Sequence, residues 1–226
     1  MARISSQTLF NFTDTIEFLI DNLENGFYCH TTFEKLPYGK NGYRVPMACF
    51  CDIPLSLIKE HFNWYGRYGI GIKKSYGREL GVKPVWYITS ESELVRSFVK
   101  SKALADHERK HLLPFMKQYL GNQYFAKIGE EKRKKFYDER EWRYIPKGSS
   151  VETFFGEREI REMPVSTQTN QRMKLDLSQI EYIIIEKDSD FELMLDKLKQ
   201  LSVDRDIRYE TLISKLITSR QIEQDF

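Results

Sequence analysis

Glu139 and Glu141 are separated by one residue and form an E-x-E pair. Among the patterns in this sequence, this pair most directly suggests electrostatic or acid–base chemistry. Glu141 opens the segment EWRYI at 141–145, which its composition predicts as a strand. Because side chains alternate along a strand, both carboxylates should point to one face. Two neighbouring carboxylates repel each other, which would raise the pKa of one of them. The alternative is an exposed strand edge where these glutamates pair with arginines.

A second pattern is the H-E-x-x-H motif formed by His107, Glu108 and His111 on a predicted helix. Two histidines one helical turn apart can ligate zinc, with the intervening glutamate as general base. Glu130 or Glu131 could supply a third ligand. The two residues between Glu108 and His111 are charged, however, which is typical of a solvated helix face. We therefore expect no zinc at this motif.

The three cysteines, Cys29, Cys49 and Cys51, form an odd number, which argues against a disulfide framework and favours a reducing compartment. Cys49 and Cys51 lie on a predicted strand and would share one face. No further metal ligands accompany them. We interpret them as small buried hydrophobic residues.

The segment YGRYGIG at 65–71 contains three glycines but is not a dinucleotide-binding fingerprint. That fingerprint requires a strand followed by a helix, whereas the order predicted here is a helix followed by a strand. The glycines instead predict a tight turn and close approach of neighbouring backbone. A contact with a ligand is the alternative.

The segment KIGEEKRKK at 127–135 is locally basic and is predicted to be a solvated helix. Contact with RNA or DNA is a weaker interpretation, because two glutamates interrupt the basic run.

Composition limits the class of protein. The chain has 226 residues, of which 41% are hydrophobic and 14% aromatic, enough for a folded core. The 35 basic and 33 acidic residues give a net charge of only +2, which provides no overall attraction to nucleic acid or anionic membrane. No apolar stretch approaches the roughly 18 residues that span a bilayer, and the N-terminus does not resemble a signal peptide. We expect a cytoplasmic protein without membrane contact.

The pattern of elements predicts one α+β domain over residues 1–226, with a twisted, mostly antiparallel sheet and flanking helices. Asp14 should cap the first helix, Gly26 should end it, and Leu19 and Leu23 should be buried against the sheet. Strands are predicted at 8–12, 45–53, 68–73, 82–88, 141–145 and 181–186. Helices are predicted at 14–25, 56–65, 91–120, 127–135, 190–201 and 208–218, and a long loop at 147–172.

Several of these segments together resemble the AbiGi family of phage-resistance proteins. The resemblance is carried by residues 9–26 (LFNFTDTIEFLIDNLENG), 45–57 (VPMACFCDIPLSL), 65–74 (YGRYGIGIKK), 117–121 (KQYLG) and 139–146 (EREWRYIP). Membership would imply the antitoxin component of an abortive-infection pair, with a protein partner from the same defence system. It would not define a chemical reaction.

A looser resemblance is to ADP-ribosyltransferases such as the DNA-modifying DarT toxins. In those enzymes an H-x-T strand precedes a helix ending in glycine, and a later strand carries a catalytic glutamate, often in E-x-E. Here Asn11 and Thr13 stand at the H-x-T positions, with asparagine in place of histidine, and Glu139 and Glu141 form the later pair. The resemblance implies an NAD site with Glu141 and Glu139 as catalytic groups.

The remaining contacts of such an NAD site would come from Asn11, Thr13 and the aromatic residues Tyr65 and Tyr68. An aromatic ring could stack on the nicotinamide, and a carboxylate near the ribose would stabilise developing positive charge. Because asparagine cannot reproduce the proton chemistry of histidine, a non-catalytic version that only binds a partner is also open. Three hypotheses thus remain, namely an ADP-ribosyltransferase-like enzyme, an antitoxin acting by protein contact, and a zinc hydrolase.

Overall fold

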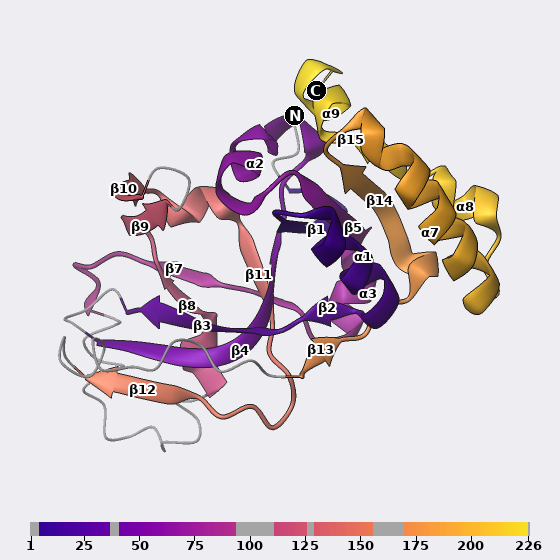
Figure 1. The fold of residues 1–226 in the computed structure, drawn as a ribbon. Helices are drawn as coiled ribbons and strands as arrows, with labels where there is room; N and C mark the ends of the chain where they lie inside the picture. Colours follow the sequence, from indigo (N-terminus) through magenta and orange to yellow (C-terminus); the bar gives the residue numbers. More distant parts are fainter. Residues whose placement is uncertain (1–4, 37–40, 94–110, 126–128, 156–169, 226) are drawn as a thin grey trace. The chain divides into compact units, whose positions relative to one another are not determined.

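The structure, a computed structural model, describes residues 5–36, 41–93, 111–125, 129–155 and 170–225 (Figure 1). The chain divides into two compact units, each assembled from separate stretches of sequence. Unit 1 contains Met1–Tyr28, Cys49–Gly81 and Arg172–Phe226, and unit 2 contains Cys29–Ala48 and Val82–Gln171. The single-domain assignment over 1–226 stays a prediction.

Unit 1 is built on a mixed sheet. Strand β5 (Tyr68–Lys73) pairs antiparallel with β1 (Thr8–Thr13) on one side and with β14 (Ile180–Ile185) on the other. Strand β15 (Leu216–Thr218) extends the sheet parallel to β14, and Phe10 of β1 pairs with Cys51 at the end of β4 (Asn41–Cys51). A separate short ladder joins β2 (Phe27–Tyr28) to β13 (Arg172–Met173).

Helices accompany this sheet: α1 (Ile16–Asn25), α2 (Lys59–Tyr65), α3 (Lys74–Glu79), α7 (Phe191–Asp204), α8 (Tyr209–Ile213) and α9 (Ser219–Asp225) (Figure 1). Helix α1 buries Leu19 and Leu23, as predicted from their spacing. Its N-terminal cap is Thr15, whose hydroxyl accepts from the N–H of Phe18, so the assignment of the cap to Asp14 was wrong by one residue. The helix ends at Gly26, which has a φ of 85°.

The glycines of 65–71 permit close packing in unit 1, as predicted. Gly66 ends α2 with a φ of 98°, and a Cβ there would lie 2.1 Å from the carbonyl oxygen of Thr13. Gly69 and Gly71 of β5 leave room for the rings of Phe12 and Phe10, which a Cβ would approach to 2.8 Å and 2.7 Å. The chain therefore needs glycine here for packing between β5 and β1.

Unit 2 contains the remaining strands. Within β4, residues 42–47 pair antiparallel with β3 (His30–Lys35), and residues 41–44 pair with β12 (Glu152–Phe155). Strand β11 (Glu141–Tyr144) pairs with β6 (Lys83–Pro84), and β7 (Trp86–Ile88) runs parallel to β8 (Met116–Gln118). Strands β9 (Gly121–Phe125) and β10 (Glu130–Lys134) form a hairpin.

Four predicted segments were wrong in part. The basic run at 127–135 contains a strand, β10, because pairing with β9 rather than its charged, helix-like composition decides its conformation. Most of the helix predicted at 91–120, with a break near Pro114, lies outside the described residues, and its predicted last part is instead a short 3₁₀ turn, Leu113–Phe115, followed by β8. The predicted loop at 147–172 includes β12 and the start of β13, and the last predicted helix ends at Ile213 before β15.

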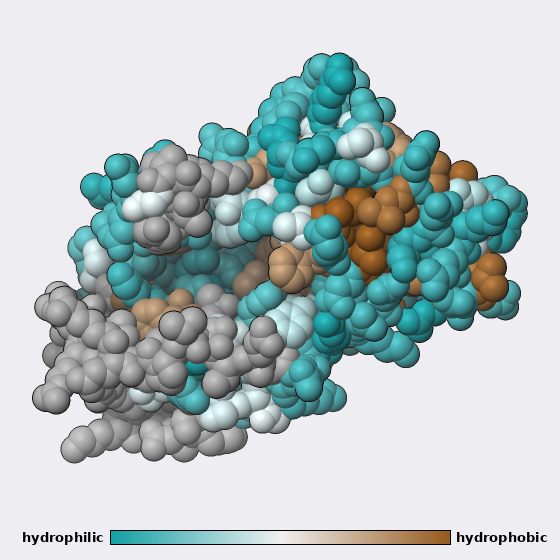
Figure 2. Space-filling model, viewed as in Figure 1, coloured by the Kyte–Doolittle hydropathy of each residue, from teal (hydrophilic) through white to brown (hydrophobic). Residues whose placement is uncertain are grey.

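The observed α+β class with a mixed, mostly antiparallel sheet confirms the fold prediction. The face shown in Figure 2 is largely hydrophilic, with hydrophobic residues gathered over α1 and α7. Among the helices that the structure describes, none combines the length and apolar character required to cross a membrane.

Candidate functional site

The E-x-E segment of unit 2 lies inside the protein rather than at an exposed edge. Glu139 ends a short 3₁₀ turn, Phe136–Glu139, and Glu141 begins β11. Their exposed fractions are only 4% and 6%. Along β11 the side chains alternate, so that Glu141 and Arg143 are buried, whereas Trp142 and Tyr144 are half-buried.

Glu141 and Arg143 form a two-point ion pair along the same face of β11. The Nε of Arg143 donates to Oε1 of Glu141 at 2.7 Å, and Nη2 donates to Oε2 at 3.1 Å. Arg143 is fully buried, and its Nη1 also donates to the Pro114 carbonyl at 2.7 Å and to the Tyr43 hydroxyl at 2.6 Å. This arginine is thus held by three separate segments of unit 2.

Lys117 of β8 lies between the two glutamates. Its Nζ is 2.7 Å from Oε2 of Glu141 and 2.9 Å from Oε2 of Glu139. The other oxygen of Glu139 lies 2.6 Å from Nζ of Lys134 in β10. All four carboxylate oxygens of the E-x-E pair therefore accept from cationic groups of the protein.

Neighbouring groups complete this buried ion cluster. Glu34 of β3 pairs with Nη2 of Arg143 at 3.0 Å and lies 3.8 Å from Nζ of Lys117. The hydroxyl of Tyr87 accepts from the N–H of Glu141 at 2.7 Å. We define the ion cluster as its three carboxylates and three cations: Glu34, Glu139, Glu141, Lys117, Lys134 and Arg143.

The cations keep both glutamates ionised. Burial alone would raise the pKa of Glu141, but Arg143 and Lys117 outweigh it and hold that pKa well below its usual value. Burial likewise raises the pKa of Glu139, but Lys117 and Lys134 have the larger effect, so the net pKa is lowered. The expectation that repulsion would raise the pKa of one carboxylate was wrong, because Lys117 separates the two charges. The expected exposed edge was wrong too, although the expected pairing with arginine occurs.

The same cluster perturbs its other members. Burial lowers the pKa of Lys117, but the surrounding glutamates raise it well above the usual value. For Lys134 burial prevails over Glu139, and its pKa is lowered. Burial raises the pKa values of Tyr43 and Tyr87, so both remain neutral hydrogen-bonding groups. With equal numbers of positive and negative groups, the arrangement is suited to holding β3, β8, β10 and β11 against one another within unit 2.

Asn11, the proposed polar anchor for NAD, lies in unit 1 and connects elements there. Its Nδ2 donates to the carbonyl of Cys49 at 2.9 Å, and its Oδ1 accepts from Nδ2 of Asn22 at 3.4 Å. Asn22 in turn accepts from the N–H of Tyr28 at 3.2 Å. The side chain of Asn11 thus links β1 to β4 and α1.

The other residues proposed to bind NAD also belong to unit 1. Tyr68 is buried, and its hydroxyl donates to Oδ2 of Asp190 at 2.9 Å. Thr13 pairs with Tyr68 across β1 and β5. Tyr65 lies at the end of α2, with its ring 5.8 Å from that of His61. The structure therefore brings Asn11, Thr13, Tyr65 and Tyr68 into unit 1, and Glu139 and Glu141 together in unit 2.

No group of three or more potential metal ligands occurs among the described residues. His107 and Glu108 lie outside them, so the prediction that the H-E-x-x-H motif binds no zinc remains a prediction. Cys29 and Cys51 are buried, whereas Cys49 is half-buried, so the interpretation of Cys49 and Cys51 as buried hydrophobic residues holds for Cys51 and was wrong for Cys49.

Sequence reasoning missed most of the partners of the E-x-E pair. Arg143 could have been found, since it lies two residues after Glu141 and must share its face of the strand. Lys117 lies 24 residues from Glu141, in a region predicted to be helical. Nothing local in the sequence indicates that contact.

The fold and the ion cluster define an α+β protein whose acidic pair is neutralised internally. The model of a family described as putative abortive phage resistance protein AbiGi, antitoxin, matches residues 43–186, and the chain belongs to this family. It is also 27% identical to the abortive phage resistance protein AbiGi of Lactococcus lactis subsp. cremoris, over 90% of this chain and 96% of the relative. No solved structure matches the chain.

Proposed function

We propose that this chain is the antitoxin-type component of an abortive-infection system and that it acts by binding a protein partner of the same system. The family description supports the antitoxin role. The main observation that favours partner binding over catalysis is that all four carboxylate oxygens of Glu139 and Glu141 pair with Lys117, Lys134 or Arg143. A carboxylate committed in this way supports the fold and has no free oxygen for a substrate.

Exposed apolar side chains on unit 1 support protein contact. Phe18 of α1 and Leu193 of α7 are 54% and 50% exposed. Figure 2 shows hydrophobic residues gathered over these two helices. Apolar residues that gather on a surface commonly mark a site of protein interaction.

The competing hypothesis is an ADP-ribosyltransferase-like site with NAD bound by Asn11, Thr13, Tyr65 and Tyr68 and with Glu141 as the catalytic carboxylate. The polar atoms of Asn11 and the hydroxyl of Tyr68 are used in contacts within unit 1. Both oxygens of Glu141 are used within unit 2. An NAD site on these residues would require those contacts to be exchanged, and we therefore favour partner binding.

Growth of cells that express the partner toxin, with and without this chain, tests the proposal. Phe18→Ser and Leu193→Ser should each reduce the rescue of growth while leaving the thermal stability of the chain unchanged. Val203→Ser is a matched control, because Val203 is also exposed on α7 but lies about 15 Å from Leu193 at 1.5 Å per residue. Full rescue by both Phe18→Ser and Leu193→Ser would exclude this surface.

The enzymatic hypothesis is tested with the purified chain and radiolabelled NAD. Partner binding predicts no NAD cleavage above background and no labelled product. Cleavage that Glu141→Gln abolishes, but that an equally destabilised Lys117→Met variant retains, would replace the proposal with the enzyme.

A further inference from the structure

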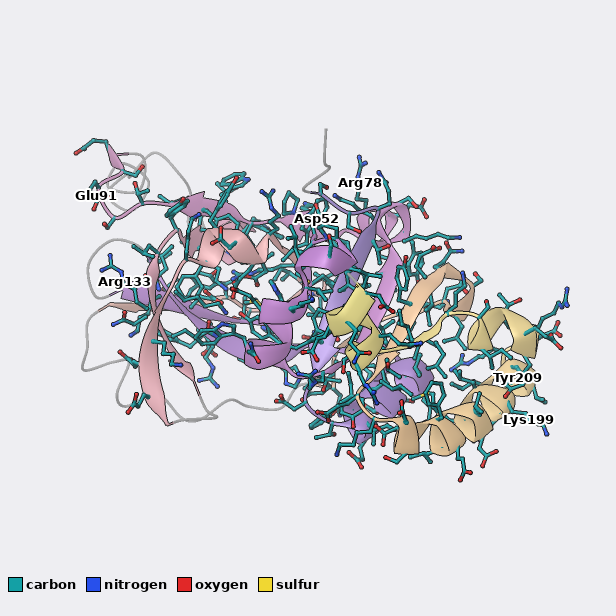
Figure 3. All side chains as sticks on the ribbon, turned by 90° about the horizontal axis from the view of Figure 1, so that it is seen from above. Asp52, Arg78, Glu91, Arg133, Lys199 and Tyr209 are labelled. Atoms are coloured by element: carbon teal, nitrogen blue, oxygen red, sulfur yellow. The ribbon has the colours of Figure 1, made fainter. Side chains whose placement is uncertain are left out.

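Unit 2 contains a polar cavity of about 520 Å³ that is separate from the ion cluster. It is lined by residues at the end of β3, the turn after β7, the β8–β9 connection and strand β10. Figure 3 shows that two of its lining residues, Glu91 and Arg133, extend from different segments. Cavities of a few hundred Å³ are of the size that binds small organic ligands.

Two cations line this cavity without ion-pair partners in the part of the chain that is described. Arg133 alternates on β10 with Lys134, so that Lys134 reaches Glu139 while Arg133 faces the cavity. Lys35, the last residue of β3, is the second cation. Among the described residues, no carboxylate lies within 4.0 Å of either cationic group.

Two carboxylates also line the cavity, and neutral groups donate to them. Glu91 accepts from the hydroxyl of Ser90 at 2.6 Å, and Glu131 accepts from Nδ2 of Asn122 at 3.5 Å. The lining is thus balanced in charge, which does not favour a polyanion such as a nucleic acid strand. It suits a small ligand that carries both a phosphate group and N–H or O–H donors.

An aromatic ring completes the cavity. Tyr119 lines it, and the Tyr119 ring packs against the ring of Tyr137 at 5.4 Å with an interplanar angle of 30°. Nζ of Lys135 lies 5.7 Å from the centre of the Tyr119 ring. These contacts hold Tyr119 in place, and a fixed aromatic side chain is a common support for a nucleobase.

We propose that this cavity binds a nucleoside phosphate, with the phosphate at Lys35 and Arg133 and the base beside Tyr119. The hydroxyls and amino groups of the ligand donate to Glu91 and Glu131. The proposal uses none of the residues of the ion cluster and does not depend on the proposed antitoxin function.

Calorimetric titration of the full chain with ADP tests the site. One saturable binding event is expected, weakened about 10-fold or more by Lys35→Gln and by Arg133→Gln, because each removes a charge-assisted hydrogen bond to phosphate. Lys132→Gln is the matched control, since it removes a charge from the same strand on the opposite face. Absence of saturable ADP binding, or equal weakening by Lys132→Gln, overturns the proposal.

Inorganic pyrophosphate separates a nucleotide site from a simple phosphate site. Tyr119→Leu should weaken the affinity for ADP about 10-fold and leave the affinity for pyrophosphate unchanged. Tyr119→Phe should bind ADP as tightly as the unmodified chain, because stacking needs the ring and not the hydroxyl. Hydrogen exchange should show protection of residues 118–122 on addition of ADP to the unmodified chain, a result independent of variant folding. If pyrophosphate binds as tightly as ADP and Tyr119→Leu does not weaken ADP binding, the assignment to a nucleotide is refuted.

Discussion

Replacement of Glu141 by glutamine is the sharpest test of the buried ion cluster. The two side chains are nearly equal in shape, so the change adds no cavity. In the native protein Oε1 accepts from Arg143, while Oε2 accepts from Lys117 and Arg143. A glutamine presents one oxygen and one NH₂ group, and in either orientation the NH₂ group faces a cationic donor.

The charge balance gives the magnitude. The ion cluster has three carboxylates and three cations, so Glu141→Gln leaves two carboxylates and three cations, a buried net charge of +1. Breaking a buried ion pair by removing one partner typically costs about 3–5 kcal/mol. For a chain of 226 residues, at about 2–4 °C per kcal/mol, this corresponds to a fall in Tm of about 6–20 °C.

Thermal unfolding followed by circular dichroism measures this effect. Glu152→Gln is the control, because it makes the same chemical change at an exposed position on β12 and should alter stability by no more than about 0.5 kcal/mol. The double variant Glu141→Gln/Lys117→Met restores the charge balance and should recover part of the loss. A Tm for Glu141→Gln within 1 °C of that for Glu152→Gln would refute the described cluster.

Three further predictions concern acid stability, a glycine and a tyrosine. The folded-state pKa values of Glu139 and Glu141 lie below the ordinary value of 4.5, so the stability that these groups contribute is fully present above that pH and is lost as pH falls through the lowered values. Urea titrations between pH 3 and 7 should show this loss of unfolding free energy. If the free energy of unfolding depended on pH with the same slope in Glu141→Gln, the reasoning would be contradicted. Gly66→Ala should destabilise the chain by about 2 kcal/mol or more, whereas Gly148→Ala should cost about 1 kcal/mol. Both glycines have positive φ, but only at Gly66 would the added Cβ also clash with backbone atoms. Equal losses of unfolding free energy in urea would disprove the reasoning. Tyr68→Phe removes the hydrogen bond to Asp190 and should cost about 0.5–1.5 kcal/mol in the same assay, whereas no loss would show that this bond contributes nothing.

Local sequence patterns determined much of unit 1. The spacing of Leu19 and Leu23 and the glycine at 26 defined helix α1, because a helix with one buried face needs that periodicity and a residue tolerant of positive φ at its end. The glycine after α2, Gly66, correctly indicated close backbone approach, and those of β5 leave room for the rings of Phe10 and Phe12. These features depend on residues close together in the chain.

Tertiary structure alone decided the surroundings of the E-x-E pair. Lys117 reaches Glu141 from 24 residues away, and Tyr43 reaches Arg143 from 100 residues away. Composition around Lys117 and Lys134 favours a helix, yet both residues lie on strands, because strand pairing is settled by distant partners. The sequence thus indicated that two carboxylates lie close together and that Arg143 follows the second of them, while the fold determined that they are buried, since only tertiary packing brings Lys117 to both.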